Sequence, residues 1–169
     1  MTSRVSIIGL GLVCCCWLSV LFLVVVSAAS DDAKDKDSPK LDVICLGCIC
    51  EAASGCNQTL GCVGDVCGPF HITQIYWTDS GKPTLDSDKP EATDEEAFAR
   101  CVNDVNCAAR AVQGYMEKYS QDCNGDGVID CEDYARIHYL GGYGCSAAAK
   151  LDKNYAKAFN FCQKAFQAV

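Results

Sequence analysis

The sequence predicts a mainly α-helical, disulfide-rich fold of the α+β class with little sheet. Twelve cysteines lie between Cys45 and Cys162, and six of them fall within the 23 residues from Cys45 to Cys67. A dense, even set of thiols is typical of secreted domains that are held together by disulfides. Apolar residues recur at three- and four-residue spacing in later segments, as amphipathic helices require, and only one short stretch is rich in β-branched residues. We therefore expect a small helical domain with six bridges.

The first 40 residues predict a leader and a tail. An apolar run over residues 5–26 follows Arg4 and ends in small residues, which predicts a signal peptide over residues 1–28. The alternative is a membrane anchor, because the run is long enough to span a bilayer core of about 30 Å. No cluster of basic residues follows it, which favours cleavage. Residues 29–40 are polar and charged and predict a tail, and residues 41–169 have the size of one domain.

The charge of the chain excludes several classes of partner. The formal net charge is −8, and residues 1–28 contain Arg4 and no acid, so their removal leaves a net charge of −9. Such a surface repels polyanions, which argues against nucleic acid and against electrostatic capture of anionic membranes or bacterial walls. After signal cleavage we expect a secreted, extracellular protein with no nucleic-acid partner and no membrane partner.

The first half of the domain predicts short elements. Residues 41–70 are too rich in Cys and Gly for long regular structure, so we expect one or two helical turns around residues 49–54. Residues 72–77 (ITQIYW) are β-branched and aromatic, which favours a short strand or a buried turn. Residues 78–90 contain Gly and two prolines and predict a loop.

The second half predicts helices. Thr93 and Glu96 form a capping-box signature, and apolar residues recur from Phe98 to Met116. This pattern predicts one helix, or two helices broken near residues 103–106. A further helix is expected from Cys131 to the glycines at 141–142, and a last one over residues 154–166.

Three ordered blocks resemble the invertebrate-type (i-type) lysozyme family, which is also called the destabilase family. They are residues 45–56 (CLGCICEAASGC), 67–77 (CGPFHITQIYW) and 131–145 (CEDYARIHYLGGYGC). The resemblance implies a lysozyme-like fold whose cleft binds the β-1,4-linked amino sugars of bacterial peptidoglycan. It also implies the disulfide pairs Cys45–Cys123, Cys48–Cys162, Cys50–Cys56, Cys62–Cys67, Cys101–Cys107 and Cys131–Cys145.

The catalytic residues implied by the resemblance are incomplete. Glycosidases of this kind need one protonated carboxyl group as acid and one ionised carboxylate. Active members have a Glu directly before the Ser-Gly-Cys block, and this chain has Ala53 there. Glu51 is the nearest replacement, but two residues rotate a helical side chain by about 200°, so Glu51 is expected to face away from the cleft. The second carboxylate corresponds to Asp65.

Further site residues follow from the resemblance and from local motifs. We expect substrate contacts from Phe70, Ile72, Tyr76 and His138. The alternative for Tyr76 and Trp77 is a core position, and the alternative for His138 is a structural hydrogen bond to a backbone carbonyl. His71 is expected either to bind sugar hydroxyls or to cap a turn. Asn57-Gln-Thr59 is an N-glycosylation sequon.

Residues 122–133 (DCNGDGVIDCED) are similar to a calcium loop of the EF-hand or dockerin type. The alternative is an acidic turn in which the Asp side chains cap a helix. No cofactor is required for the expected chemistry, so calcium would be structural. The ligands of such a site would be Asp122, Asn124, Asp126, Val128 through its carbonyl, and Asp133.

Two functions follow from these features. The first is hydrolysis of the MurNAc–GlcNAc bonds of peptidoglycan in antibacterial defence or digestion. The second is that of a catalytically inactive carbohydrate-binding or immune-modulating protein, which Ala53 favours.

Overall fold

A computed structural model describes residues 41–89 and 92–167 of the chain. The described residues form a mostly helical fold with one two-stranded antiparallel sheet, as the sequence predicts. The expected signal peptide and tail lie outside the described residues. In chain order the elements are α1 (Val43–Ser54), β1 (Cys62–Val63), β2 (Val66–Cys67), α2 (Gln74–Asp79), α3 (Asp94–Asn103), α4 (Val105–Tyr119), α5 (Cys131–Leu140) and α6 (Lys153–Gln167).

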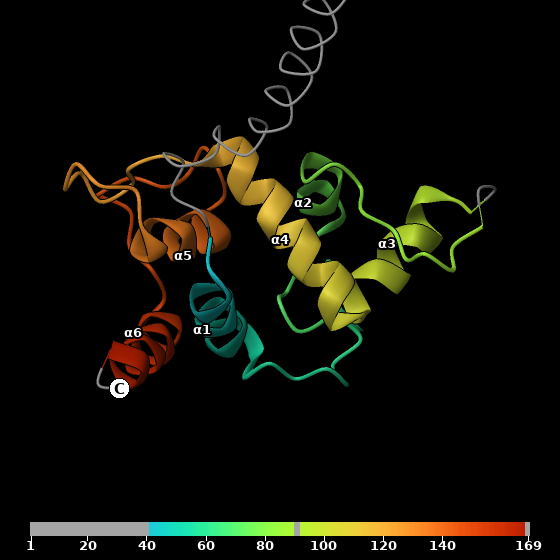
Figure 1. The fold of residues 1–169 in the computed structure, drawn as a ribbon, viewed down its shortest axis with the longest axis horizontal. Coiled ribbons are helices and arrows are strands. Elements are labelled where there is room, and N and C mark those ends of the chain that lie inside the picture. Colours follow the sequence, from blue (N-terminus) through green and yellow to red (C-terminus); the bar gives the residue numbers. More distant parts are fainter. Residues whose placement is uncertain (1–40, 90–91, 168–169) are drawn as a thin grey trace, which may run out of the picture. The chain divides into compact units, whose positions relative to one another are not determined.

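Helix α4 runs through the middle of the domain (Figure 1). It packs against α2 and α3 on one side and against α5 on the other, while α1 packs against α5 and most extensively against α6. None of these helices is long and apolar enough to span a membrane.

Side-chain caps set the boundaries of the central helices. Thr93 and Glu96 form the predicted capping box at the start of α3. Asp104 then adopts an extended conformation, which ends α3, and its carboxylate accepts a hydrogen bond of 2.8 Å from the N–H of Cys107. One residue thus stops one helix and starts the next, and the periodic segment forms two helices rather than one.

Two local predictions are wrong. Helix α1 is a full three turns, because the Asp42 carboxylate accepts from the N–H of Cys45 at 2.7 Å and starts the helix early. The segment around Tyr76 is helix α2 and not a strand or turn. The hydroxyl of Thr73 accepts from the N–H of Tyr76 at 3.2 Å, and the helix buries Tyr76 and Trp77 on one side. Tertiary burial here overrides the β-propensity of the residues.

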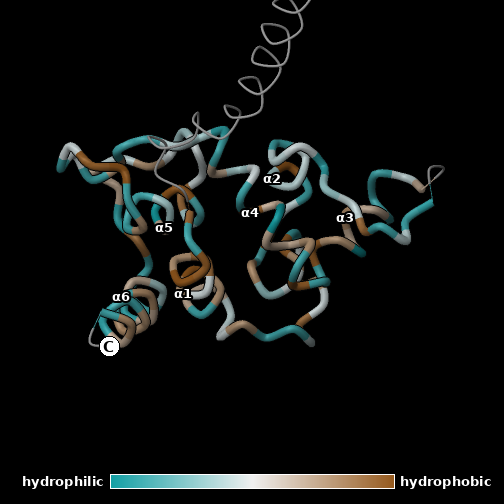
Figure 2. Tube along the Cα trace, viewed as in Figure 1, coloured by the Kyte–Doolittle hydropathy of each residue, from teal (hydrophilic) through white to brown (hydrophobic). Residues whose placement is uncertain are grey.

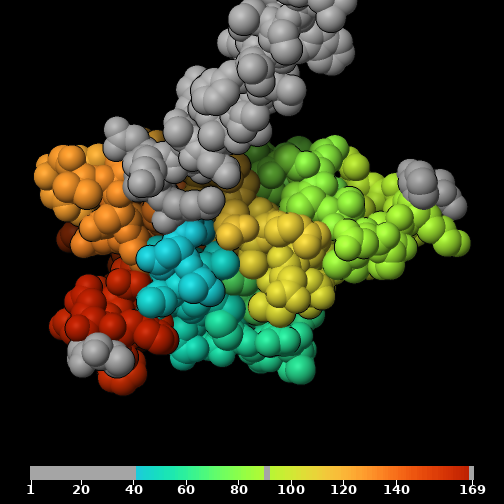
Figure 3. All heavy atoms as spheres, in the orientation of Figure 1, coloured from blue at the N-terminus to red at the C-terminus, as the bar shows by residue number. Residues whose placement is uncertain are grey.

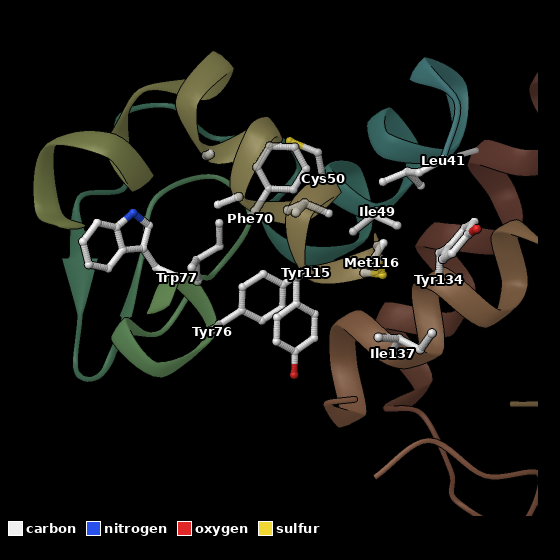
Figure 4. Close-up of a cluster of buried hydrophobic side chains, with 14 of the residues drawn as sticks. Leu41, Ile49, Cys50, Phe70, Tyr76, Trp77, Tyr115, Met116, Tyr134 and Ile137 are labelled. Atoms are coloured by element: carbon white, nitrogen blue, oxygen red, sulfur yellow. The ribbon is translucent and has the colours of Figure 1, made fainter. Parts of the chain in front are cut away.

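The core lies between α1, α2, α4 and α5 (Figure 4). Ile49, Trp77, Met116 and Ile137 are almost completely buried in it. Helix α1 is apolar along much of its length (Figure 2), which suits its place between two other helices.

Six disulfides join the twelve cysteines. Four pairs are those that the family resemblance implies: Cys48–Cys162, Cys50–Cys56, Cys62–Cys67 and Cys101–Cys107. Cys48–Cys162 joins α1 to α6 across a sequence separation of 114 residues. A bridge that closes so long a loop contributes on the order of 4 kcal/mol in the chain-entropy view.

The other two expected pairs exchange partners. The structure has Cys45–Cys131 and Cys123–Cys145 instead of Cys45–Cys123 and Cys131–Cys145. Cys131 is the first residue of α5, and packing against α1 brings its Cα to 5.6 Å from that of Cys45. Cys123 lies in the preceding loop, with its Cα 5.3 Å from that of Cys145. The packing of α5 therefore decides the pairing, and spacing along the chain does not.

Candidate functional site

A pocket of about 390 Å³ lies where the end of α1 approaches the end of α5 and the start of α6. We call it the Ala53 pocket. Its lining residues come from five separate segments of the chain: Ala52, Ala53, Val66, His71, His138, Tyr139, Asp152, Asn154 and Tyr155.

The end of α1 is fixed by its own capping residues. Gly55 has a φ of 66°, in the left-handed region that favours glycine, and its N–H donates to the carbonyl of Glu51. The hydroxyl of Ser54 donates to the carbonyl of Pro69 at 2.6 Å. This bond ties the end of α1 to the turn that carries His71, and so it places Ala53 and His71 in the same pocket.

The two carboxylates predicted for catalysis are not brought together in the pocket. Ala53 lines it, whereas Glu51 is exposed and lines a separate groove beside α6. This is the side of α1 that the helical rotation predicts for Glu51. Asp65 is exposed in the turn between β1 and β2 and is not a lining residue.

One carboxylate among the described residues lines the pocket, and the sequence analysis missed it. Asp152 accepts hydrogen bonds from the N–H groups of Asn154 at 2.8 Å and Tyr155 at 3.1 Å. These bonds lower the pKa of Asp152, with the one from Tyr155 contributing most. A carboxylate that stays ionised does not donate a proton at neutral pH, so Asp152 cannot replace the missing acid. From the sequence alone, Asp152 cannot be told from an ordinary residue that caps the start of a helix.

His138 forms the floor of the pocket. Its Nε2 lies 2.8 Å from the carbonyl oxygen of Phe70, so Nε2–H is the donor. Its Nδ1 is 3.0 Å from the hydroxyl of Tyr76 and accepts from it. The pKa of His138 is lowered to about 4, mainly by burial; the bond to Phe70 opposes the shift, and nearby His71 adds a smaller lowering effect. The ring is therefore neutral at pH 7 and both nitrogens are used within the protein.

The rim of the pocket is polar and aromatic. His71 is exposed, and it has a φ of 53°, which is uncommon for a residue other than glycine. Partial burial lowers the pKa of His71, so it too is mostly neutral at pH 7. Tyr139 is 46% exposed, and its ring centroid lies 4.7 Å from that of Tyr155. The sequence analysis did not single out Tyr139, because periodicity alone places it on the outer face of α5.

The remaining residues predicted to contact substrate are buried. Phe70 is 2% exposed, Ile72 is fully buried, and Tyr76 is 9% exposed. Tyr76 stacks on Tyr115 with ring centroids 3.7 Å apart, as Figure 4 shows. Their side chains support the pocket from below, and the surface that a ligand meets belongs to other residues.

Sequence comparison shows the family of the chain. The destabilase family profile matches residues 42–162, which is more than half of the 169-residue chain. The chain belongs to the destabilase family.

Several proteins to which the chain is similar are named lysozymes. Invertebrate-type lysozyme 3 of Caenorhabditis elegans is 40% identical over 111 residues, covering 63% of this chain and 77% of that protein. A Magallana gigas lysozyme is 41% identical over 113 residues, covering 63% and 71% respectively. The crystal structure of Tapes japonica lysozyme superposes with a TM-score of 0.52 at 32% identity, covering 75% of this chain and 93% of that chain. The fold of this destabilase-family chain is therefore lysozyme-like.

The predicted calcium loop of this destabilase-family chain is closed by its own hydrogen bonds. The carboxylate of Asp122 accepts from the N–H groups of Gly125 and Gly127 at 2.6 and 2.9 Å. Asp133 is buried and accepts from the N–H groups of Cys123 and Asp130 at 2.8 and 2.9 Å, so it completes the capping box of α5, whose N-cap is Asp130. Within the described residues no group of three or more His, Cys, Asp or Glu side chains is placed to hold a metal ion.

Ligation by the other predicted groups, Asn124, Asp126 and the carbonyl of Val128, stays a prediction. The carboxylate of Asp126 accepts from the N–H of Val128 at 2.9 Å and from the side-chain amide of Asn124 at 3.0 Å. These are short-range bonds that hold the loop in a turn without an ion.

The sequon lies in the exposed loop after α1. The Oδ1 of Asn57 accepts from both the N–H and the hydroxyl of Thr59, at 3.0 and 2.9 Å. The N–H of Asn57 donates to the hydroxyl of Ser54 at 3.1 Å, which anchors the loop to the end of α1. Glycosylation of Asn57 stays a prediction.

Proposed function

We propose that this destabilase-family chain is a secreted lysozyme-like protein that binds amino-sugar polymers of the peptidoglycan type in the Ala53 pocket. In this proposal it does not hydrolyse their β-1,4 bonds at the rate of a lysozyme. One observation carries the second part: the only carboxylate that lines the pocket among the described residues, Asp152, holds two backbone N–H groups and stays ionised.

The residues of the pocket support sugar binding. Sugars are held by polar groups that reach their hydroxyls and by aromatic faces that cover their apolar sides. His71 and Asn154 supply the polar groups, and Tyr139 supplies an exposed ring at the edge. The six disulfides support the extracellular part of the proposal, because such bridges persist in oxidising compartments.

The second candidate function is hydrolysis of the MurNAc–GlcNAc bonds of bacterial peptidoglycan. It is favoured by the relatives, which are named lysozymes, and by Asp65, which the family resemblance assigns as the second carboxylate. In that case Glu51 would have to supply the proton from the other side of α1.

The test combines binding with turnover. Wild type is expected to bind insoluble peptidoglycan in a sedimentation assay and to leave the turbidity of a cell-wall suspension unchanged. Ala53→Glu is expected to clear the suspension about 10²–10⁴ times faster than the matched control Ala53→Gln, which has the same size but no proton to donate.

The alternative makes a different prediction in the same assay. If wild type clears the suspension and Glu51→Gln or Asp65→Asn abolishes the clearing, the chain is an enzyme and the proposal is wrong. Failure of wild type to bind peptidoglycan would contradict the proposal as well.

A further inference from the structure

Helix α6 is a positively charged element in an acidic chain. It contains Lys153, Lys157 and Lys164 and no acidic residue, whereas the whole chain has a formal net charge of −8. None of its three lysines forms an ion pair with a described residue, although Lys82, Lys118 and Arg100 do so elsewhere. Their charges are therefore available to a ligand.

Two of these lysines line a groove between α6 and α1. The groove has a volume of about 580 Å³, and we call it the α6 groove. Lys157, Phe161 and Lys164 follow one another at spacings of four and three residues, so they share one face of the helix. Phe161 is 76% exposed. The remaining lining residues are Glu51, Asn154, Ala158 and Asn160.

The residues that line the α6 groove are not the residues that pack α6 against the rest of the domain. The opposite side of α6 buries Tyr155 and Phe159, and the disulfide Cys48–Cys162 fixes the helix to α1. Figure 3 shows α6 (red) lying directly against α1 (blue). The side chains of Phe161, Lys157 and Lys164 are therefore not needed to hold α6 in place.

The groove and the Ala53 pocket have one lining residue in common. Asn154 lines both of them, at the first turn of α6. A ligand long enough to reach from the pocket past Asn154 would meet Lys157, which lies one turn further along the helix.

We infer that the α6 groove binds the carboxylate-bearing part of a peptidoglycan strand whose sugars occupy the Ala53 pocket. This inference rests on the proposed function. The free carboxylates of the stem peptides of such a strand lie beside its sugars, and they pair with the ammonium groups of Lys157 and Lys164. Phe161 covers apolar parts of the stem peptide, and Glu51 pairs with its free amino groups. Charge complementarity selects this ligand over an uncharged amino-sugar chain.

The test compares two double variants with the same change of charge. Lys157→Gln/Lys164→Gln removes the charges of the groove, and Lys150→Gln/Lys153→Gln removes two exposed charges nearby that do not line it. Titration calorimetry of the full folded domain uses soluble peptidoglycan fragments with intact stem peptides and, separately, uncharged chitooligosaccharides. We expect the groove variant to bind the fragments about fivefold more weakly, because exposed ion pairs contribute little each. We expect no change with chitooligosaccharides or with the control variant.

The other outcomes overturn the inference in distinguishable ways. Unchanged binding of fragments by the groove variant overturns it while leaving the proposed function intact. An equal loss in both double variants reveals a general charge effect and overturns it too. If the groove variant only dissociates an oligomer, seen by light scattering, a second copy of the chain is the occupant. If wild type binds neither ligand, the proposed function fails and the inference fails with it.

Discussion

The floor and the rim of the Ala53 pocket are built in different ways. The floor consists of His138, Tyr76 and Phe70, which are joined by hydrogen bonds of 2.8 and 3.0 Å; Tyr76 and Phe70 are buried in the core, and His138 is half-buried. The rim consists of Ala53, His71 and Tyr139, which reach the surface and make no such network. The floor is thus part of the fold, and the rim is the part that meets a ligand.

This difference predicts which replacements the pocket tolerates. Replacing a rim residue such as Ala53 changes the chemistry and leaves the supporting hydrogen bonds in place. Replacing a floor residue leaves buried polar groups without partners, which costs stability. The same resemblance to an active family is therefore informative about the shape of the site and uninformative about its turnover.

The largest expected effect is a difference in stability between a variant at His138 and a variant at His71. His138→Ala leaves the Tyr76 hydroxyl and the Phe70 carbonyl without their partner and opens a cavity, and we expect it to lower the free energy of unfolding by about 3 kcal/mol. His71→Ala at the exposed rim is the matched control, with an expected change within about 0.5 kcal/mol. Urea unfolding of both variants measures the free energies of unfolding. Equal decreases in the two variants would remove the distinction between floor and rim.

The second prediction concerns pH. The pKa of His138 is about 4 in the folded protein and 6.5 in the unfolded chain, so the unfolded chain binds the proton first. The contribution of His138 to stability is complete above pH 6.5 and is lost as the pH falls towards 4. We expect a loss of about 2 kcal/mol over this window, after allowance for the partial exposure of the ring.

Unfolding free energies of wild type and His138→Ala, measured from pH 7 to pH 4, isolate this effect from the titration of carboxylates. The difference between the two proteins should shrink as the pH falls. A constant difference would show that His138 does not titrate in this range.

A smaller effect is expected from the hydroxyl that orients His138. Tyr76→Phe keeps the stacking on Tyr115 but removes the donor to Nδ1, which should cost about 1 kcal/mol and raise the pKa of His138. Tyr143→Phe is the control, because Tyr143 is 92% exposed. Thermal unfolding gives the stability, and NMR titration of the imidazole gives the pKa; identical behaviour of the two variants would contradict this role for the hydroxyl.

The smallest effect is expected from calcium. The loop over residues 122–133 precedes α5, which carries His138, so an ion in the loop would support the floor. Because the loop is already closed by hydrogen bonds, we expect chelation to lower stability by only about 1 kcal/mol at calcium concentrations a few times the Kd. Differential scanning calorimetry with and without chelator measures this, and Asp126→Ala should abolish the response. The same melting temperature with and without chelator would exclude the site.

Local sequence signals predicted much of the fold. The capping box at Thr93 and Glu96, the glycine after Leu140 and the apolar spacing of the last helix all correspond to boundaries in the structure. The prediction failed at residues 74–79, where β-branched and aromatic residues form a helix. The helix packs against α4 and buries Tyr76 and Trp77, and no local pattern reports that contact.

The site was less predictable than the fold. The helical period placed Glu51 away from Ala53, and the structure agrees. No local pattern connects Asp152 or Tyr139 with Ala53, because they are 99 and 86 residues away along the chain. Phe70 and Ile72 were expected at the surface of the cleft and are buried beneath it.

The sequence by itself determined the family, the helical class and the absence of an acid at position 53, because each of these depends on residue identity and short-range spacing. Tertiary structure decided the pairing of Cys45 with Cys131 and of Cys123 with Cys145, the division of the pocket into floor and rim, and the place of Asn154 in the lining of both pocket and groove. These features depend on how α1, α5 and α6 pack together. Packing brings distant residues within a few ångströms, and local spacing contains no record of that distance.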